Sequence, residues 1–418
     1  ESTKKKDISA SRRVLALMER NGLGSVSALS NQLIRMFGDC GCLQEANDLF
    51  SKVAVPTVHS WNAIISAYLQ KGNNEKVLLL YEEMLGKKYI KPDIVTFLFL
   101  LKACGNIGCV IQGYLIHDQI MKNVFESNVP ISNSLMDMYS KLGALTEANS
   151  VFKNLANPTL VSWGVMVLGY SNNGQGLVSL NLFEKMQNLN VYPDKVIFLG
   201  LIKACASICA IEKGRELHHH IVSFGLDVDA VVSNSLLDMY AKCRMLEEAQ
   251  KVFDQLLDKN IISCTALMAG YAQIGKCENV FLIFDKIIGE GMKPDLVTLG
   301  SLLNACSHSG LVDKGKTYFD SIVKNHGRAL KLEHYVCMID MLGRAGHVVD
   351  AIGMIEKMPF QPGIIAWHIV LGACRKWGNV ELGRCAFENA IRLDAKDPTA
   401  YICMSNIYMK AAMQEDAR

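Results

Sequence analysis

The sequence predicts an all-α protein, a right-handed α-solenoid (superhelix) of stacked helix-turn-helix repeats. Three observations predict this fold. Similar segments return at a period near 101 residues, each period divides into three shorter repeats, and each repeat has the pattern of two amphipathic helices. A helix pair of this size cannot bury its apolar face alone, so neighbouring pairs are expected to stack on one continuous core.

Three landmarks recur in the same order along the chain. The first is the segment around Trp61, which returns around Trp163, Cys264 and Trp367. The second is Lys-Ala-Cys at 102–104 and 203–205, which returns as Asn-Ala-Cys at 304–306. The third is Ser-Asn-Ser-Leu-Met-Asp-Met-Tyr at 132–139, which returns at 233–240 with Leu in place of the first Met. Interleaved landmarks at one period are not expected by chance, and they identify a repeat array. The tryptophans are predicted to lie in the core between repeats.

Each period divides into repeats of about 35, 35 and 31 residues. The first type covers 58–93, 160–194 and 261–295; the second covers 94–128, 195–229 and 296–331; the third covers 27–57, 129–159, 230–260 and 332–363. Residues 1–26 are predicted to be a partial repeat, the second helix of a repeat of the second type. Residues 364–418 follow the last full repeat.

The repeat 129–159 shows the two helices. Leu135 and Tyr139 lie four residues apart on one helical face, and Lys-Leu-Gly at 141–143 interrupts the pattern. A second helix is predicted over 145–155. It is predicted to end before Pro158, because proline cannot extend a helix and restricts the residue before it.

The composition excludes several classes of protein. Half of the residues are hydrophobic and 20% are charged, which rules out wholesale disorder. The formal net charge is +2, so no global positive field attracts nucleic acid, although a local basic groove is compatible with this balance. No apolar stretch approaches the roughly 20 residues of a membrane-spanning helix.

The sequence predicts neither a metal site nor a cofactor. The 14 cysteines include no Cys-x-x-Cys pair, and most lie in apolar runs such as that ending at Cys104, so they are predicted to be reduced structural thiols. His218, His219 and His220 are adjacent on a predicted helix. Adjacent helical residues point about 100° apart, so the three imidazoles cannot face one ion.

These repeats resemble those of pentatricopeptide repeat proteins, specifically the plant organellar subclass with alternating P-, L- and S-type motifs. The lengths of about 35, 35 and 31 residues carry the resemblance, with Ser-Trp-Asn at 60–62, Lys-Ala-Cys at 102–104 and the octapeptide at 132–139. The resemblance implies ten motifs over 27–363, in the order S followed by three P-L-S triplets. Residues 364–418 resemble the family's E extension, C-terminally incomplete.

The resemblance implies that the array reads single-stranded RNA, one base per repeat. In the family, the fifth and last residues of a motif hydrogen-bond the base edge. The implied pairs are Asn62 with Asp93 for U, Thr265 with Asp295 for G, Asn234 with Asn260 for C or U, and Asn133 with Thr159 and Asn31 with Thr57 as weaker pyrimidine readers. The second residue helps to sandwich the base, which implies this role for Val95, Val161, Val196, Val231, Ile262 and Val297.

Other repeats depart from the family pattern. Asp194 has Gly164 as its fifth-position partner, which lacks a side chain that could reach a base. The fifth residues of the remaining repeats cannot donate or accept with a side chain; they are Leu98, Leu199, Gly300 and Val336, the last paired with Gly363. His59 departs from the apolar second position. A structural alternative also applies to every pair, because Asn and Pro-Asp near a helix start commonly act as caps.

The resemblance implies a site-recognition factor for organellar C-to-U RNA editing, in the mitochondrion or the chloroplast. The E-type region would bind protein partners, and no membrane is involved. Neither His-x-Glu nor Cys-x-x-Cys occurs, so this chain is predicted not to be an enzyme, with a deaminase supplied in trans or by a missing C-terminal segment. The alternatives are a structural RNA-binding subunit of an organellar ribonucleoprotein and a protein-binding helical scaffold.

Overall fold

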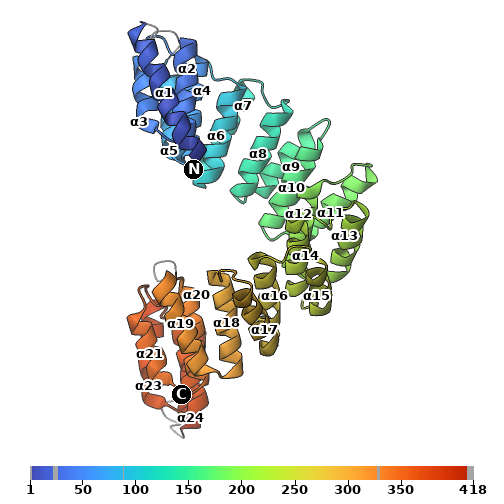
Figure 1. The fold of residues 1–418 in the computed structure, drawn as a ribbon, viewed down its shortest axis with the longest axis vertical. Helices are drawn as coiled ribbons and strands as arrows, with labels where there is room; N and C mark the ends of the chain where they lie inside the picture. Colours follow the sequence, from blue (N-terminus) through green and yellow to red (C-terminus); the bar gives the residue numbers. More distant parts are fainter. Residues whose placement is uncertain (1, 22–26, 88, 327–329, 412–418) are drawn as a thin grey trace. The chain divides into compact units, whose positions relative to one another are not determined.

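The structure is a computed structural model that describes residues 2–21, 27–87, 89–326 and 330–411. All regular secondary structure in these residues is helical, and 24 α-helices follow one another along the chain (Figure 1). The predicted all-α class is therefore confirmed. None of the described helices combines the length and the apolar character that crossing a membrane requires.

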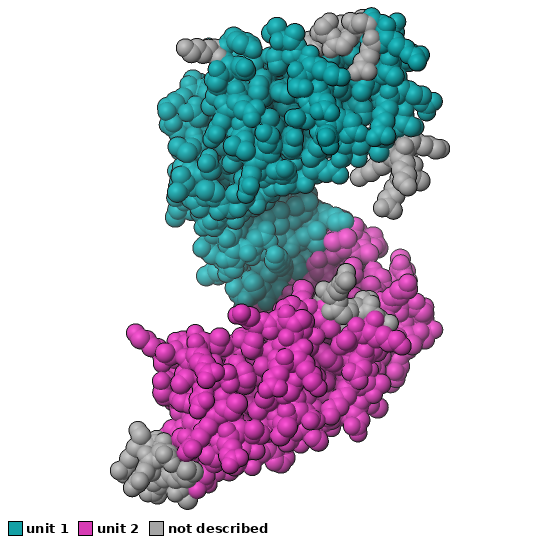
Figure 2. Space-filling view, turned by 90° about the vertical axis from the view of Figure 1, so that its left-hand side faces the viewer, with its two compact units in different colours: residues 1–208 teal, residues 209–418 magenta. Residues whose placement is uncertain are grey.

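The chain divides into two compact units, residues 1–208 (unit 1) and 209–418 (unit 2), which Figure 2 colours separately. Unit 1 contains α1 (Ser2–Arg20), α2 (Ser27–Cys40), α3 (Leu43–Lys52), α4 (Val58–Gln70), α5 (Asn74–Leu85), α6 (Ile94–Ile107), α7 (Val110–Lys122), α8 (Val129–Lys141), α9 (Leu145–Asn154), α10 (Leu160–Asn172), α11 (Gly176–Asn188) and α12 (Lys195–Ile208). Unit 2 contains α13 (Ile211–Ser223), α14 (Ala230–Lys242), α15 (Leu246–Gln255), α16 (Ile261–Gln273), α17 (Cys277–Gly289), α18 (Leu296–Ser309), α19 (Val312–His326), α20 (Leu332–Arg344), α21 (Val348–Lys357), α22 (Ile364–Trp377), α23 (Val380–Leu393) and α24 (Pro398–Lys410).

Within each unit the even-numbered helices form a continuous row. In unit 1, each even helix from α2 to α10 contacts the next even helix, and the same holds from α14 to α22 in unit 2. Each odd helix that lies between two even helices of its unit packs against both; α5, for example, contacts α4 and α6. Each repeat therefore contributes one even and one odd helix, as a stacked helical array requires.

Glycine allows the sharp reversal after three of the even helices. Gly108, Gly310 and Gly378 follow α6, α18 and α22 with φ angles of 82°, 69° and 75°. This left-handed conformation costs little for a residue without Cβ. In each case the glycine N–H donates to the carbonyl of a cysteine four residues earlier, which closes the helix end.

The predicted core positions are confirmed. Trp61, Trp163 and Trp367 are 3%, 5% and 6% exposed. Trp61 meets the edge of Phe50 at a ring-centroid distance of 4.8 Å, and Trp163 meets Phe152 at 4.9 Å, so these two tryptophans join neighbouring repeats.

The landmark cysteines also lie in the core. Cys104, Cys205, Cys306 and Cys374 are fully buried in even-numbered helices, and all are free thiols. Burial raises the pKa of Cys104 to about 12, which keeps this thiol protonated. These cysteines therefore act as small apolar core residues, as predicted.

Close packing of even helices depends on small residues at their crossings. A Cβ added to Gly270 of α16 would lie 2.8 Å from the Cβ of Ala241 in α14 and 2.8 Å from Cδ2 of Leu246. A helical glycine without such a neighbour is Gly353 in α21, where nothing lies within 4 Å of an added Cβ.

We expect Gly270→Ala and Gly353→Ala to change the stability of unit 2 in opposite directions. Gly270→Ala should lower the free energy of unfolding by about 1–3 kcal/mol, because the added methyl overpacks the α14–α16 contact. Gly353→Ala should raise it by about 0.5–1 kcal/mol, because alanine favours the helix. Chemical denaturation followed by circular dichroism measures both. Equal effects of the two variants would contradict the close-packing argument.

Candidate nucleic-acid interface

The fifth and last residues of the repeats come together at the first turns of the even helices. The last residue of each repeat directly precedes the next even helix: Asp93 precedes α6, and Asp295 precedes α18. The fifth residue lies on the first turns of the preceding even helix. Because adjacent even helices contact each other, residues about 30 positions apart in the sequence meet at each junction. We call the fifth and last residues of one repeat its reading pair.

The reading pair Asn62 and Asp93 is joined by a direct hydrogen bond. The side-chain amide of Asn62 donates to Oδ1 of Asp93 at 2.9 Å. A third residue completes the cluster: Oγ1 of Thr96 lies 2.7 Å from Oδ1 of Asn62 and 2.8 Å from Oδ1 of Asp93. The structure thus brings together the two residues that the resemblance implied, and adds Thr96.

The capping alternative is confirmed for Asp93. Its Oδ1 accepts the backbone N–H of Thr96 at 2.9 Å, and the Thr96 hydroxyl accepts the backbone N–H of Asp93 at 3.3 Å, which is a capping box. Burial alone would raise the pKa of the Asp93 carboxyl. The hydrogen bonds from Thr96 and Asn62 outweigh burial and hold this pKa below its usual range.

The reading pair Thr265 and Asp295 meets through a bridging residue. Oγ1 of Thr265 lies 2.6 Å from Oγ1 of Thr298, and Thr298 Oγ1 donates to Oδ1 of Asp295 at 2.7 Å. The backbone N–H of Thr298 donates to the same carboxylate oxygen at 2.7 Å, so Asp295 caps α18. The structure therefore also joins these two predicted residues.

Asn133 and Thr159 are likewise joined through the hydroxyl of a third residue, Ser162. Oγ of Ser162 donates to Oδ1 of Asn133 at 2.7 Å and lies 3.0 Å from Oγ1 of Thr159, which caps α10. The corresponding amide oxygens of Asn31 and Asn234 are buried and have no hydrogen-bond partner among the described residues. Their last-residue partners, Thr57 and Asn260, still form capping boxes at α4 and α16.

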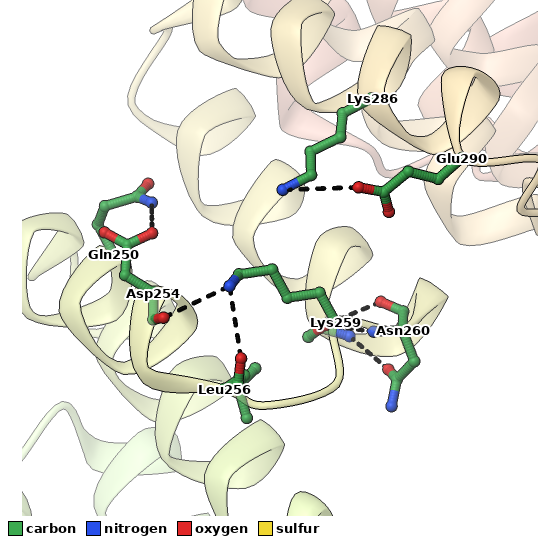
Figure 3. A network of polar contacts seen from close by, with 8 residues as sticks. Gln250, Asp254, Leu256, Lys259, Asn260, Lys286 and Glu290 are labelled. Carbon is green, nitrogen blue, oxygen red and sulfur yellow. Dashed lines mark hydrogen bonds and ion pairs between the residues drawn. The ribbon is translucent and has the colours of Figure 1, made fainter.

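The loop before α16 is held by its own polar contacts (Figure 3). The ammonium of Lys259 donates to the carbonyl oxygens of Asp254 and Leu256, both at 3.4 Å, and lies 5.5 Å from the ring centre of Phe253. The amide of Gln250 donates to the Asp254 carboxylate at 2.9 Å. Asn260 follows directly and accepts the backbone N–H groups of Ile262 and Ser263. This loop therefore fixes the N-cap of α16.

The predicted sandwiching residues form a series of exposed apolar side chains. Each is the second residue of an even helix, and their exposed fractions range from 42% to 62%; they are Val95, Val161, Val196, Val231, Ile262 and Val297. Exposed β-branched side chains at the same place in successive helices offer flat apolar surfaces to a ligand. His59, which departs from this pattern, is exposed as well.

Two grooves are each lined by a residue of a reading pair and by a predicted sandwiching residue. In unit 1, a groove of about 350 Å³ is lined by Asn62 and Val95. In unit 2, a groove of about 850 Å³ is lined by Asp295, Val297 and Gly300. A planar base that enters either groove can therefore contact a reading residue and a sandwiching residue together.

The remaining predicted positions show no reading pair. Asp194 is exposed, and its Oδ1 accepts the backbone N–H of Ile197, while Gly164 has no side chain to meet it. Leu98, Leu199 and Val336 place apolar side chains at the fifth position.

Two features of the junctions were missed by reasoning from the sequence. The first is a Ser or Thr at the third residue of the following repeat, fully buried at Ser60, Thr96, Ser162, Ser263 and Thr298. The capping-box spacing after the last residue of each repeat was the signal that could have revealed it. We call this group the third-position hydroxyl.

The second missed feature lies in the region predicted to be the E extension. His368 is the fifth residue of α22, and its Nε2 donates to the carboxylate of Asp397, which precedes and caps α24. The hydrogen bond from His368 lowers the pKa of Asp397 below its usual range. The arrangement matches a reading pair in place, with an imidazole in the fifth position.

Comparison with known proteins gives consistent matches over both units. Residues 56–106 match the profile described as "PPR repeat family", residues 254–309 match "Pentatricopeptide repeat domain", and five segments match "PPR repeat", at 131–156, 161–191, 231–261, 297–326 and 333–360. Among the similar sequences of Arabidopsis thaliana, the chloroplastic pentatricopeptide repeat-containing protein CRR2 is 34% identical over 404 residues. A mitochondrial pentatricopeptide repeat-containing protein is 32% identical over 424 residues.

These alignments cover most of this chain and part of each relative. They cover 95% and 94% of this chain, but 61% of CRR2 and 62% of the mitochondrial protein. The fold is similar to a crystal structure of the pentatricopeptide repeat protein PPR10 in complex with an 18-nt psaJ RNA element, with a TM-score of 0.80 at 19% identity. That match covers 97% of this chain and 65% of the other.

We expect the contribution of Asp93 to stability to depend on pH. Its pKa is lowered in the fold, so the ionised carboxylate stabilises the folded state fully above the unfolded pKa of about 3.9, and this stabilisation is lost as the pH falls through the lower folded value. Asp93→Asn should lower the free energy of unfolding by about 1 kcal/mol at pH 7 and pH 5, and by less at pH 3.5.

Chemical denaturation of both proteins at the three pH values measures this difference. A difference between wild type and Asp93→Asn that persists undiminished at pH 3.5 would contradict the assignment.

Proposed function

Because the chain belongs to the pentatricopeptide repeat family and is related to its plant organellar members, we propose that it binds single-stranded RNA in a sequence-specific manner, with one base for each reading repeat. The observation that carries this proposal is the joining of fifth and last residues at successive helix junctions, beside exposed apolar second residues. Polar edge recognition next to apolar stacking surfaces is the usual combination for unpaired bases.

We assign U to the repeat 58–93 and G to the repeat 261–295. The pair Asn62 and Asp93 contains an amide, which donates and accepts, and a carboxylate, which only accepts. The pair Thr265 and Asp295 contains a hydroxyl and a carboxylate. Adjacent even helices place successive pairs at neighbouring junctions within each unit, which supports the contact of successive nucleotides with successive repeats.

The biological role that we propose is site recognition for C-to-U editing of organellar transcripts. The relatives named above are chloroplastic and mitochondrial, which supports a location in one of these organelles. In this role the chain recognises the editing site on the RNA, and deaminase activity comes from another protein or from another segment. The chain spans about three fifths of these relatives, so the function of a whole protein of that length is part of the proposal.

We also propose that residues 364–418 bind a protein partner. Large apolar side chains are exposed there, among them Trp377, Leu393, Tyr401, Ile402 and Met409. Such exposed apolar side chains favour association with another protein surface.

The test of RNA reading is a matched change of base and side chain. Guanine presents two donors, N1–H and the N2 amino group, whereas adenine presents an acceptor at N1 and a donor at N6. Asp295→Asn replaces an acceptor by a group that also donates, so its preference at this position should move from G to A. Good base-edge contacts are worth about 1–3 kcal/mol, so the ratio of G to A affinity should change by at least about fivefold.

Fluorescence anisotropy with short RNAs at fixed ionic strength measures this ratio, because salt alone changes RNA affinity. Each RNA carries one nucleotide for each of the ten repeats, with U or C facing 58–93 and G or A facing 261–295. The Asp295→Asn protein should still discriminate U from C at the position that faces the repeat 58–93, as wild type does. Equal binding of all RNAs by wild type, or no binding, would exclude base reading and favour a protein-binding scaffold.

A further inference from the structure

We propose that the third-position hydroxyl of the following repeat is a specificity-determining positioning residue: it sets which groups of the reading pair donate and which accept. Thr96 has this role for Asn62 and Asp93, and Thr298 for Thr265 and Asp295. The inference rests on the proposed function, and it extends the reading unit from two residues to three.

The fifth residue of a repeat and the third residue of the next repeat are correlated within this chain. In five repeats the fifth residue is polar, and in each the third residue of the next repeat is Ser or Thr: these pairs are Asn31 with Ser60, Asn62 with Thr96, Asn133 with Ser162, Asn234 with Ser263 and Thr265 with Thr298. In the other five the fifth residue is Gly, Leu or Val, and the third residue is never Ser or Thr: these pairs are Leu98 with Ile131, Gly164 with Ile197, Leu199 with Val232, Gly300 with His334 and Val336 with Ala366.

The correlation has a physical cause. All ten third-position side chains are buried, and a buried hydroxyl without a partner is costly. At the junctions of Asn62, Asn133 and Thr265 the hydroxyl lies 2.6–2.7 Å from the fifth side chain, whereas at those of Asn31 and Asn234 it hydrogen-bonds the cap residue. Where the fifth residue offers no polar group, the third residue is apolar in four of the five repeats and His334 in the other. His334 shows the same constraint, because its Nε2 donates at 2.9 Å to the backbone carbonyl of Leu296, one turn before Gly300.

At the Asn62 junction the number of available protons fixes the direction of each hydrogen bond. The Asn62 amide donates one N–H to Oδ1 of Asp93, and its Oδ1 accepts from Thr96. The reversed amide would place its oxygen against the carboxylate, so Asp93 and Thr96 together fix one orientation. Among the described residues, the second N–H of Asn62 and Oδ2 of Asp93 take part in no other hydrogen bond. The pair therefore presents one donor and one acceptor, which matches O4 and N3–H of uracil.

The same count gives a different result at the Thr265 junction. The amide oxygen of Asn62 carries no proton and must accept from Thr96, whereas the Thr265 hydroxyl can itself donate to Thr298. The single hydroxyl proton of Thr298 therefore goes to the Asp295 carboxylate. Thr265 then faces a base as an acceptor only, and Oδ2 of Asp295 is a second acceptor. Two acceptors match N1–H and the N2 amino group of guanine. The third-position hydroxyl thus produces a donor–acceptor pair in one repeat and an acceptor–acceptor pair in another.

Thr96→Val tests the proposal, with Thr96→Ser as the matched control. Valine keeps the shape of threonine but removes the hydroxyl, whereas serine keeps the hydroxyl. Without it the Asn62 amide is held in its orientation only by the hydrogen bond to Asp93, so the reversed amide, which presents its oxygen to the amino group of cytosine, becomes more populated. We expect wild type and Thr96→Ser to bind the RNA with U facing 58–93 at least about fivefold more tightly than the RNA with C, and Thr96→Val to bind the two within about twofold.

The ratio of affinities separates this role from a purely structural one. Loss of packing or of the helix cap would weaken U and C binding equally and leave the ratio unchanged. The preference for G facing 261–295 is measured on the same proteins and should stay constant in all three. If Thr96→Val does not fold, Thr298→Val gives the equivalent test, since its ratio of G to A affinity should fall while discrimination of U from C remains.

Each outcome decides between the proposals. A wild-type preference for U and for G, retained in full by Thr96→Val or Thr298→Val, would overturn the role of the hydroxyl and leave RNA reading intact. A wild-type protein that discriminates at neither position would overturn RNA reading, and the role of the hydroxyl with it.

Discussion

The contact between consecutive even-numbered helices is the constraint on which the rest of this structure depends. Small residues such as Gly270 let these helices approach closely, and tryptophans such as Trp61 fill the space between neighbouring repeats. This close contact places the first turn of one even helix against the cap of the next. Asn62 and Asp93 lie 31 positions apart, near the start and at the end of one repeat. They meet at hydrogen-bond distance because α6 of the next repeat lies against α4.

At these junctions one residue caps a helix and also belongs to a proposed reading pair. Asp93 caps α6 with its Oδ1, and the same oxygen holds the Asn62 amide. The capping and base-reading interpretations of the sequence are therefore compatible rather than competing. A consequence is that the choice of last residue is limited to side chains that can cap a helix, which are Asp, Asn and Thr in the repeats with polar fifth residues.

Much of this architecture was accessible from the sequence. Each even helix from α2 to α20 begins at the first residue of a repeat inferred from the period. From α4 to α22, the last residue of the preceding repeat stands directly before the helix. The fifth and last residues could be named from the family resemblance. The base that each repeat reads remains a prediction, as do the E-type assignment and the editing role.

What the sequence could not provide were contacts that depend on atomic placement across repeats. The spacing of Thr96 after Asp93 indicates a capping box, but its contact with the Asn62 amide arises because α6 lies against α4. The juxtaposition of His368 and Asp397 was overlooked because that region was interpreted as a docking extension. The shared hydroxyl at the junction also bears on engineering. A chimaera cut between Asp93 and Ile94 would separate Asn62 and Asp93 from Thr96, so recombinant arrays that exchange whole repeats should be joined after the third residue of the next one.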